Sequence, residues 1–224
     1  MKKTANTVDM WELLARDLGE LLYDGPEGAV VRKYHRGMIA TDIIDPDALL
    51  EVLRRLNLPE ADQFVVKSKE AFAALEREYG FTGSCPCTQW VYLKKEPPVP
   101  MDCDIRPLPM EYAQQAATHY HLIEKSLPYI RSRIEAGQVF GLFEERKLAG
   151  FIGTHSEGAI GMLEVFPEYR RKGYGYALEA YIISWILQRG WTPYCHVVEG
   201  NDASVRLQQK LGMECAELPA LWIY

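Results

Sequence analysis

The sequence predicts a mixed α/β fold in which helices pack against an open sheet, and three observations carry this prediction. The chain has 224 residues, of which 48% are hydrophobic and 25% are charged, the composition of a packed globular protein. Short apolar runs typical of strands are followed by an alternation of helical and strand patterns. The proline-rich stretch KKEPPVPMD at 94–102 is typical of a linker and divides the chain into two domains, 1–100 and 102–224.

Periodicity places the individual elements in order. Apolar residues that recur at three- and four-residue steps predict helices, and short apolar runs predict strands. In the first domain we expect a helix at 8–22, strand-like chain at 29–40, a helix at 46–56, a strand at 63–67, a helix at 68–79 and a strand at 88–93. In the second we expect a strand at 104–107, two helices within 109–136, strands at 139–145, 147–155 and 159–166, a helix at 174–189, a strand at 194–198, a helix at 202–211 and a strand at 215–224.

Charge and cysteine usage exclude several classes of function. The net charge is −6, so the chain has no general attraction for phosphate backbones, and we expect no nucleic-acid partner. The N-terminal sequence MKKTANTVDMWELL lacks the apolar core of a secretory signal, and no window has 18 uninterrupted apolar residues, so we expect a cytoplasmic protein that does not enter a membrane. A metal site from Cys85, Cys87 and Cys103 is conceivable, but paired CxxC spacing is absent, and we expect reduced thiols and no metal.

The sequence contains a candidate internal repeat. Residues 65–92 and 197–224 align without a gap at an offset of 132, with identity at seven of 28 positions, where ordinary composition gives about two. Gly80 falls on Gly212 and Trp90 on Trp222. The pattern favours a duplication, although strand–helix–Gly–strand units resemble one another in any case.

Residues 161–177, GMLEVFPEYRRKGYGYA, carry the strongest signal for function. An apolar strand ends at Pro167, a basic turn with Gly173 and Gly175 follows, and an amphipathic helix then begins. Successive N–H groups in such a turn, together with the helix dipole and the charges of 170–172, form an anion site of pyrophosphate size. The alternative is a solvated charged turn whose glycine starts the helix.

The stretch VFPEYRRKGYGYA resembles the acetyl-CoA-binding signature V-x-P-x-x-R-x-x-G-x-G/A of the GCN5-related N-acetyltransferase (GNAT) superfamily. The segment NDASVRLQQKLGM at 201–213 is similar to the second motif of that superfamily. PEYRRKGYG together with YCHVVEGNDAS looks most like the glycine N-acyltransferase-like branch. The resemblance implies a GNAT fold over 102–224 and a degenerate, partial GNAT-like domain over 1–100.

The resemblance also implies which residues bind acyl-CoA. The pyrophosphate would contact the backbone N–H groups of the turn, and the Val165 N–H would face the thioester carbonyl. Asn201 would hold the pantetheine arm or, equally, cap the following helix. The cofactor-binding residues expected in this way are Val165, Arg170, Arg171, Lys172, Gly173, Tyr174, Gly175, Asn201 and Ser204.

The catalytic groups are less sharply indicated. An amine must lose a proton before it attacks, and His196, at a strand position where the resemblance places a base, is one candidate. A hydrogen-bonded structural histidine is the alternative. The catalytic Glu of other members falls on Ala159, which leaves Glu164, with Glu157 and His155 as further neighbours. The usual general acid, a Tyr seven residues after the Asn, is Gln208.

These features together predict an acyl-CoA-dependent N-acyltransferase. We expect acetyl-CoA, or another acyl-CoA, as co-substrate and a small amine or amino acid as acceptor. The segment 112–136 suits recognition of such an acceptor and equally suits an ordinary helix surface with a packed aromatic side; its polar and aromatic residues include Tyr112, His119, Tyr120, His121, Glu124, Tyr129 and Arg131. The alternative is a non-catalytic acyl-CoA-binding module that regulates a partner. The sequence leaves open the acceptor, the acyl length, the general acid and whether the chain is a monomer or a homodimer.

Overall fold

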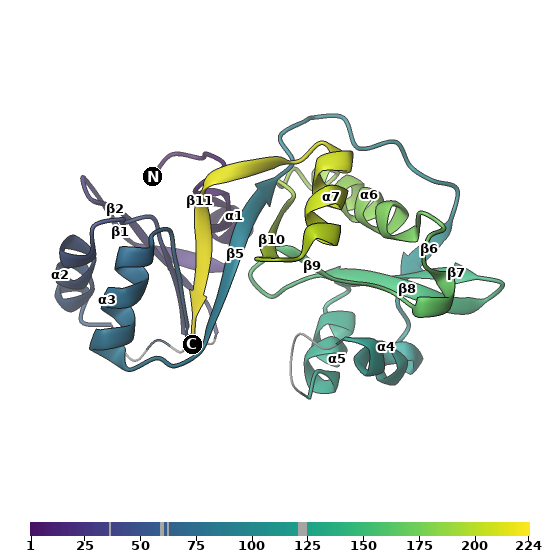
Figure 1. Ribbon diagram of the computed structural model, residues 1–224, viewed down its shortest axis with the longest axis horizontal. Helices are drawn as coiled ribbons and strands as arrows, with labels where there is room; N and C mark the ends of the chain where they lie inside the picture. Colours follow the sequence, from purple (N-terminus) through teal and green to yellow (C-terminus); the bar gives the residue numbers. More distant parts are fainter. Residues whose placement is uncertain (36, 59–60, 62, 121–124) are drawn as a thin grey trace. The chain divides into compact units, whose positions relative to one another are not determined.

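The computed structural model describes residues 1–35, 37–58, 61, 63–120 and 125–224, and these form two compact units (Figure 1). Unit 1 comprises Met1–Val91, Tyr194–Gln208 and Met213–Tyr224, and unit 2 comprises Tyr92–Pro193 and Gln209–Gly212. The mixed α/β class expected from the sequence is confirmed. The units group the chain by packing, so the domain boundary at 100–102 stays a prediction.

Unit 1 is built on a mixed sheet. Its strands follow the order β1 (Gly19–Gly25), β2 (Gly28–Lys33), β3 (Met38–Thr41), β4 (Gln63–Val66), β11 (Glu214–Ile223), β5 (Ser84–Val91) and β10 (Tyr194–Val198). The β3–β4 pair is parallel and the other pairs are antiparallel. The strand β11 therefore lies between β4 and β5, inside the sheet.

Strand alternation gives this sheet two buried faces. Val30, Ile39, Phe64 and Leu221 contribute to one apolar cluster with α2 (Pro46–Leu56) and α3 (Lys69–Tyr79). Their chain neighbours Val31, Ala40, Val65 and Ala220 contribute to a second cluster with α1 (Val8–Ala15). Because neighbouring strand residues point to opposite faces, helices cover both sides of the sheet.

Capping residues define α2 and α3. The Asp45 carboxylate accepts a hydrogen bond from Ala48 N at 2.8 Å, and the Ser68 hydroxyl oxygen accepts one from Ala71 N at 3.1 Å. Asn57 and Gly80 end the helices in the left-handed conformation, with φ of 44° and 72°. These signals are local, and both helices occur where the sequence predicts them.

Unit 2 has an antiparallel sheet in the order β9 (Ile160–Val165), β8 (Lys147–Thr154), β7 (Val139–Glu144) and β6 (Asp104–Pro107). The helices α4 (Ala113–His119) and α5 (Leu127–Glu135) lie against one face, where they share a core with Phe151 and Met162. The helix α6 (Tyr174–Leu187) packs on β7, β8 and β9 from the other face (Figure 1). Short 3₁₀ turns occupy Met110–Tyr112 and Pro167–Tyr169.

Two sequence predictions of structure are wrong in detail. The helix expected over 8–22 ends at Ala15, and β1 begins at Gly19, because residues 19–25 pair with β2. The strand-like segment 29–40 is two antiparallel strands rather than one. The remaining elements fall within a few residues of their expected positions, with β5 starting earlier, at Ser84.

The two segments of the candidate repeat share one local order. In each, a helix, α3 or α7 (Asp202–Leu211), is followed by a glycine of positive φ, 72° at Gly80 and 76° at Gly212, and then by a strand. The strands β5 and β11 pair with each other. This similarity agrees with a duplication, which stays a prediction.

Candidate functional site

The basic turn at 170–175 has the backbone of an anion site. Arg171 and Gly173 both adopt positive φ, 65° and 84°, and Gly173 is the N-cap of α6. The first N–H groups of a helix have no acceptor within the helix, and they carry the positive end of its dipole. An anion at this turn therefore meets unpaired backbone donors as well as basic side chains.

The side chains of the turn are partly committed to other groups. Arg170 donates through Nε to the Val165 carbonyl at 3.0 Å, which ties the turn to the end of β9. Lys172 Nζ lies 2.7 Å from Glu144 Oε1, and the Tyr174 hydroxyl donates to Glu144 Oε2 at 2.7 Å. The hydrogen bond to Glu144 raises the pKa of Tyr174 to about 12. Arg171 and Lys172 remain exposed enough to meet an incoming phosphate.

A bulge shapes β9 ahead of the turn. Phe151 pairs with Glu164 but Gly153 pairs with Gly161, so β9 has one extra residue, and Met162 has a φ of 56°. Phe166 N donates to Ala149 O on β8. Because N–H groups alternate along a strand, the Val165 N–H points to the edge of β9 away from β8. This is the direction that an oxyanion donor at Val165 requires.

Glu164 lies on the opposite face of β9 from Val165, as strand alternation predicts. Its register partner Phe151 belongs to the core formed with α4 and α5. Tyr120 belongs to the same core, and the negative charge of Glu164 acts on the ionisation of its hydroxyl. Burial, reinforced by Glu157 and Glu164, raises the pKa of Tyr120. Among the described residues, the buried Tyr120 hydroxyl has no hydrogen-bond partner.

His155 and Tyr129 interact with the same group of side chains as Tyr120, Glu157 and Glu164, and we call these five residues the acid and phenol cluster. The Tyr129 hydroxyl lies 2.7 Å from His155 Nδ1, and a side chain at Gly161 would place its Cβ 2.2 Å from His155 Nε2. The glycine therefore lets the imidazole lie against β9. Burial lowers the pKa of His155, partly offset by Glu157. Arg133 anchors α5 here by donating to Thr154 O at 2.9 Å.

His196 lies in unit 1, within a buried polar network. Trp222 Nε1 donates to His196 Nδ1 at 3.1 Å, and His196 Nε2 lies 2.9 Å from Gln89 Oε1. Lys67 Nζ donates to the same Gln89 oxygen at 3.0 Å and to Asp9 Oδ2 at 2.7 Å. Because Nδ1 accepts from the indole, Nε2 is the protonated nitrogen of a neutral ring that satisfies Gln89. A base role for His196 therefore requires the Trp222 hydrogen bond to open.

The second motif forms the start of α7. Asn201 Oδ1 accepts from Ser204 N at 3.1 Å, which confirms the helix-cap interpretation of Asn201. Gln208 is buried, donates to the Ser204 hydroxyl at 3.4 Å, and has an Oε1 atom without a partner among the described residues. The pantetheine role of Asn201 and the role of Ser204 stay predictions.

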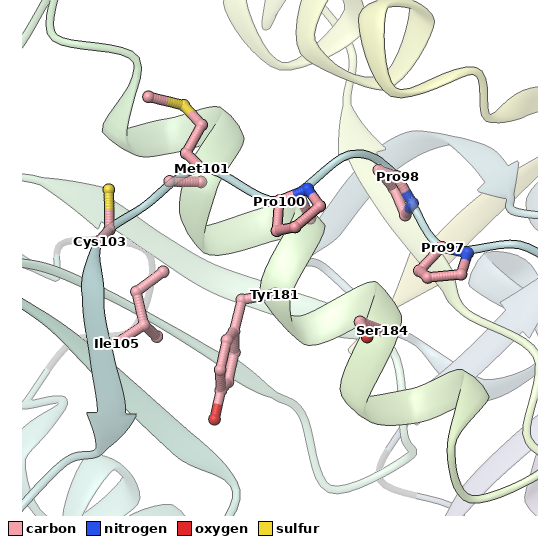
Figure 2. A pocket seen from close by; sticks show the side chains of 10 residues that line it. Pro97, Pro98, Pro100, Met101, Cys103, Ile105, Tyr181 and Ser184 are labelled. Carbon is pink, nitrogen blue, oxygen red and sulfur yellow. The ribbon is translucent and has the colours of Figure 1, made fainter.

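A pocket of about 160 Å³ lies in unit 2 between the proline-rich segment and α6 (Figure 2). Pro97, Pro98 and Pro100 line it opposite Tyr181 and Ser184 of α6. Met101 also lines the pocket and approaches Gly173, where an added Cβ would lie 3.1 Å from its Cε. The lining is mostly apolar, and the proline-rich segment lies beside α6 along the pocket.

The structure thus brings some predicted residues together within a unit. Unit 2 holds the turn, Val165, Glu164 and the acid and phenol cluster; unit 1 holds His196, Asn201 and Ser204. Of the expected acceptor residues, His119 stacks on Phe166 at 4.0 Å, whereas His121 and Glu124 lie outside the described residues. Sequence reasoning missed Asp9, Lys67 and Gln89, which nothing local in the sequence connects to His196.

In the ranges given above, no three His, Cys, Asp or Glu side chains are grouped so as to hold a metal ion. None of the helices described is long and apolar enough to cross a membrane.

One family model and several solved structures are similar to this chain. The model of the family described as FR47-like protein matches residues 139–223, which run from β7 to the end of β11. No curated protein sequence matches the chain. Among solved structures, a Drosophila protein is similar with a TM-score of 0.64 at 22% identity, over 88% of this chain and 73% of its own.

Two bacterial structures extend the similarity to nearly the whole chain. A putative GNAT-family acetyltransferase from Novosphingobium aromaticivorans has a TM-score of 0.59 at 16% identity, over 98% of both chains. An acetyltransferase from the GNAT family of Colwellia psychrerythraea has a TM-score of 0.57 at 12% identity, over 100% of this chain and 97% of its own. The chain has the GNAT fold, and the FR47-like match covers 85 of its 224 residues.

Proposed function

We propose that the protein is an acyl-CoA-dependent N-acyltransferase that transfers an acyl group, acetyl in the first instance, directly to a small amine or amino acid. The observation that carries the proposal is the turn at 170–175, where two positive-φ residues precede the N-terminus of α6. The GNAT fold and the FR47-like match support the same reaction class. The glycine N-acyltransferase-like branch remains our proposal from PEYRRKGYG and YCHVVEGNDAS.

The proposed chemistry assigns a role to each part of unit 2. The turn binds the pyrophosphate of acyl-CoA through backbone N–H groups and the charges of Arg171 and Lys172. The acceptor amine attacks the thioester carbonyl, and the Val165 N–H stabilises the oxyanion that forms. The CoA thiolate leaves without a dedicated acid, since a thiol of pKa about 8.5 is already a fair leaving group.

Glu164 and His196 are the two proposed bases. Glu164 lies on the face of β9 toward the core that contains Tyr120, where a carboxylate attracts a cationic amine and can take its proton. His196 supplies an imidazole if the Trp222 bond opens. Under the Glu164 assignment, Glu164→Gln lowers kcat at least tenfold, whereas His196→Ala leaves the shape of the pH–rate profile unchanged. Loss of an ionisation near neutrality in His196→Ala would assign the base to His196 instead.

The binding step is tested by calorimetry of acetyl-CoA with Gly173→Val. A β-branched residue in the left-handed region costs about 1–2 kcal/mol, and its side chain also meets Met101. We expect the turn to relax out of this strained conformation, which turns its N–H groups away from the anion, and the affinity to fall roughly tenfold or more, tenfold being about 1.4 kcal/mol. Gly190→Val is the matched control, because Gly190 also has positive φ, 73°, in open space past the other end of α6. Equal affinities in the two variants would contradict the proposed site.

A second candidate is a non-catalytic acyl-CoA-binding module. The engaged ring nitrogens of His196 and the amide Gln208 at the usual acid position favour it. Release of free thiol from acetyl-CoA across a panel of primary amines separates the two functions once binding is measured. Binding without thiol release for any amine would favour the module.

A further inference from the structure

The strand β5 carries two thiols that lie together on one face of the unit 1 sheet. Cys85 and Cys87 are separated by Pro86, so both side chains point to the same side of the strand. Their Sγ atoms lie 3.8 Å apart, and Cys87 Sγ donates to Cys85 O at 3.6 Å. Cys85 is partly exposed, whereas Cys87 is only 3% exposed. The pair thus has one accessible and one sheltered sulfur.

The contact between the two sulfurs makes them chemically unequal. The single hydrogen of the Cys87 thiol can rotate from Cys85 O to the Cys85 sulfur, and its donation to that sulfur lowers the pKa of Cys85 to about 7. The same contact, with burial, raises the pKa of Cys87. Near neutral pH, Cys85 is therefore a substantial thiolate with an adjacent protonated thiol. This is the asymmetry between attacking and resolving cysteines in thiol–disulfide exchange.

We propose that Cys85 and Cys87 form a redox-active dithiol that closes to an intrastrand disulfide by exchange with an oxidised low-molecular-weight disulfide. In the first step the Cys85 sulfur attacks one sulfur of the small disulfide, whose S–S bond breaks. A mixed disulfide forms on Cys85, and the first small thiol leaves with the proton that Cys85 has lost. In the second step Cys87 loses its proton and attacks Cys85 Sγ, releasing the second small thiol. Two protein thiols are oxidised and one small disulfide is reduced to two thiols.

The first step prepares the second. The pKa of Cys87 is raised chiefly by its hydrogen bond to the Cys85 sulfur, with burial and the Cys85 charge adding to it. Once Cys85 is part of a mixed disulfide, its sulfur carries no negative charge and accepts hydrogen bonds only weakly. The Cys87 thiol then ionises more readily, with its sulfur already beside the bond that it must attack.

Strand geometry makes the product strained and therefore reversible. Alternate residues of an extended strand lie about 6.6 Å apart at Cα, near the upper end of the range of about 4.4–6.8 Å that disulfides accept. Closing the bond pulls β5 out of its regular extension, and strained disulfides are readily reduced. Cys85 is in register with Trp222, whose indole donates to His196, so oxidation is expected to disturb that hydrogen bond.

The test equilibrates the full-length protein anaerobically with graded ratios of reduced to oxidised glutathione. The protein is then unfolded in urea that contains excess iodoacetamide, so that every free thiol is blocked, the buried Cys87 included, and the peptides are mapped by mass spectrometry. We expect Cys85 and Cys87 to lose alkylation together, with an intact mass lower by two hydrogens and no bound glutathione. Stable glutathione on Cys85 with Cys87 still free would overturn the proposal. So would full alkylation of both at a ratio that already modifies the exposed Cys215.

Two variants and one control sharpen the result. In Cys87→Ser the resolving thiol is gone, so glutathione should accumulate on Cys85; in Cys85→Ser, Cys87 should stay reduced. Cys215→Ser is the matched control and should leave oxidation of the pair unchanged. Peptide mapping of the wild-type protein decides the question even if a β5 variant fails to fold.

Discussion

The buried ion pair of Lys67 and Asp9 gives a sharp prediction for stability. The side chains are 0% and 5% exposed, and Lys67 Nζ lies 2.7 Å from Asp9 Oδ2 and 3.0 Å from Gln89 Oε1. Substituting Lys67→Met leaves a carboxylate buried without its cation. Breaking a buried pair in this way costs roughly 3–5 kcal/mol, a large share of the roughly 5–15 kcal/mol that holds a domain folded.

Urea unfolding followed by circular dichroism measures this loss of free energy. In thermal unfolding, at roughly 2–4 °C per kcal/mol for a chain of this size, the melting temperature should fall by about 6–20 °C. The double variant Asp9→Leu with Lys67→Met removes both charges and should recover most of the loss, because apolar replacements of buried pairs are often neutral. The exposed pair Arg54–Glu78, at 3.2 Å, is the control, and Glu78→Ala should cost less than about 1 kcal/mol. A Lys67→Met loss no larger than this, or a double variant no more stable than the single, would refute the reasoning.

Three further outcomes are expected. Burial holds the pKa of His155 below 6.5 in the folded state, so the unfolded chain binds the proton first and the free energy of unfolding should fall as pH drops below about 6.5. Urea titrations between about pH 5 and pH 8 should show this dependence on pH, and His155→Gln should reduce it. Gly161→Ala should displace the His155 ring and break its contact with Tyr129, costing about 1–3 kcal/mol; an unchanged melting temperature would argue against the packing. Alkylation of Cys85 should rise with pH around a midpoint of about 7, whereas burial raises the pKa of Cys215 and places its midpoint higher; coinciding midpoints by mass spectrometry would count against the thiol contact.

Local signals were enough to predict much of the fold. The helix α2 begins and ends at its expected residues because Asp45 caps it, Pro46 starts it and Asn57 takes the left-handed conformation. The helix expected over 8–22 failed because 18–22 continue an apolar pattern, while Gly19 is in register with Lys33 of β2. Pairing with a partner strand is a tertiary effect that overrides a local helical pattern.

The candidate site likewise has one part that local sequence predicts and another that only the folded structure brings together. The turn around Gly173 could be predicted because glycines, basic residues and the following helix are contiguous in sequence. The network around His196 could not, since Asp9, Lys67, Gln89 and Trp222 come from four distant parts of the chain. A single sequence gives no information about which of its polar residues meet in the folded state.

The position of β11 has a consequence for biosynthesis. The ribosome completes this strand only after residue 223, yet β4 and β5 pair with its two edges. Until then the nascent chain exposes unpaired backbone groups along both strands, a template for pairing with other chains. The sheet of unit 1 therefore cannot be completed before residue 223 is synthesised, and premature termination ahead of β11 should yield aggregation-prone fragments that depend on chaperones.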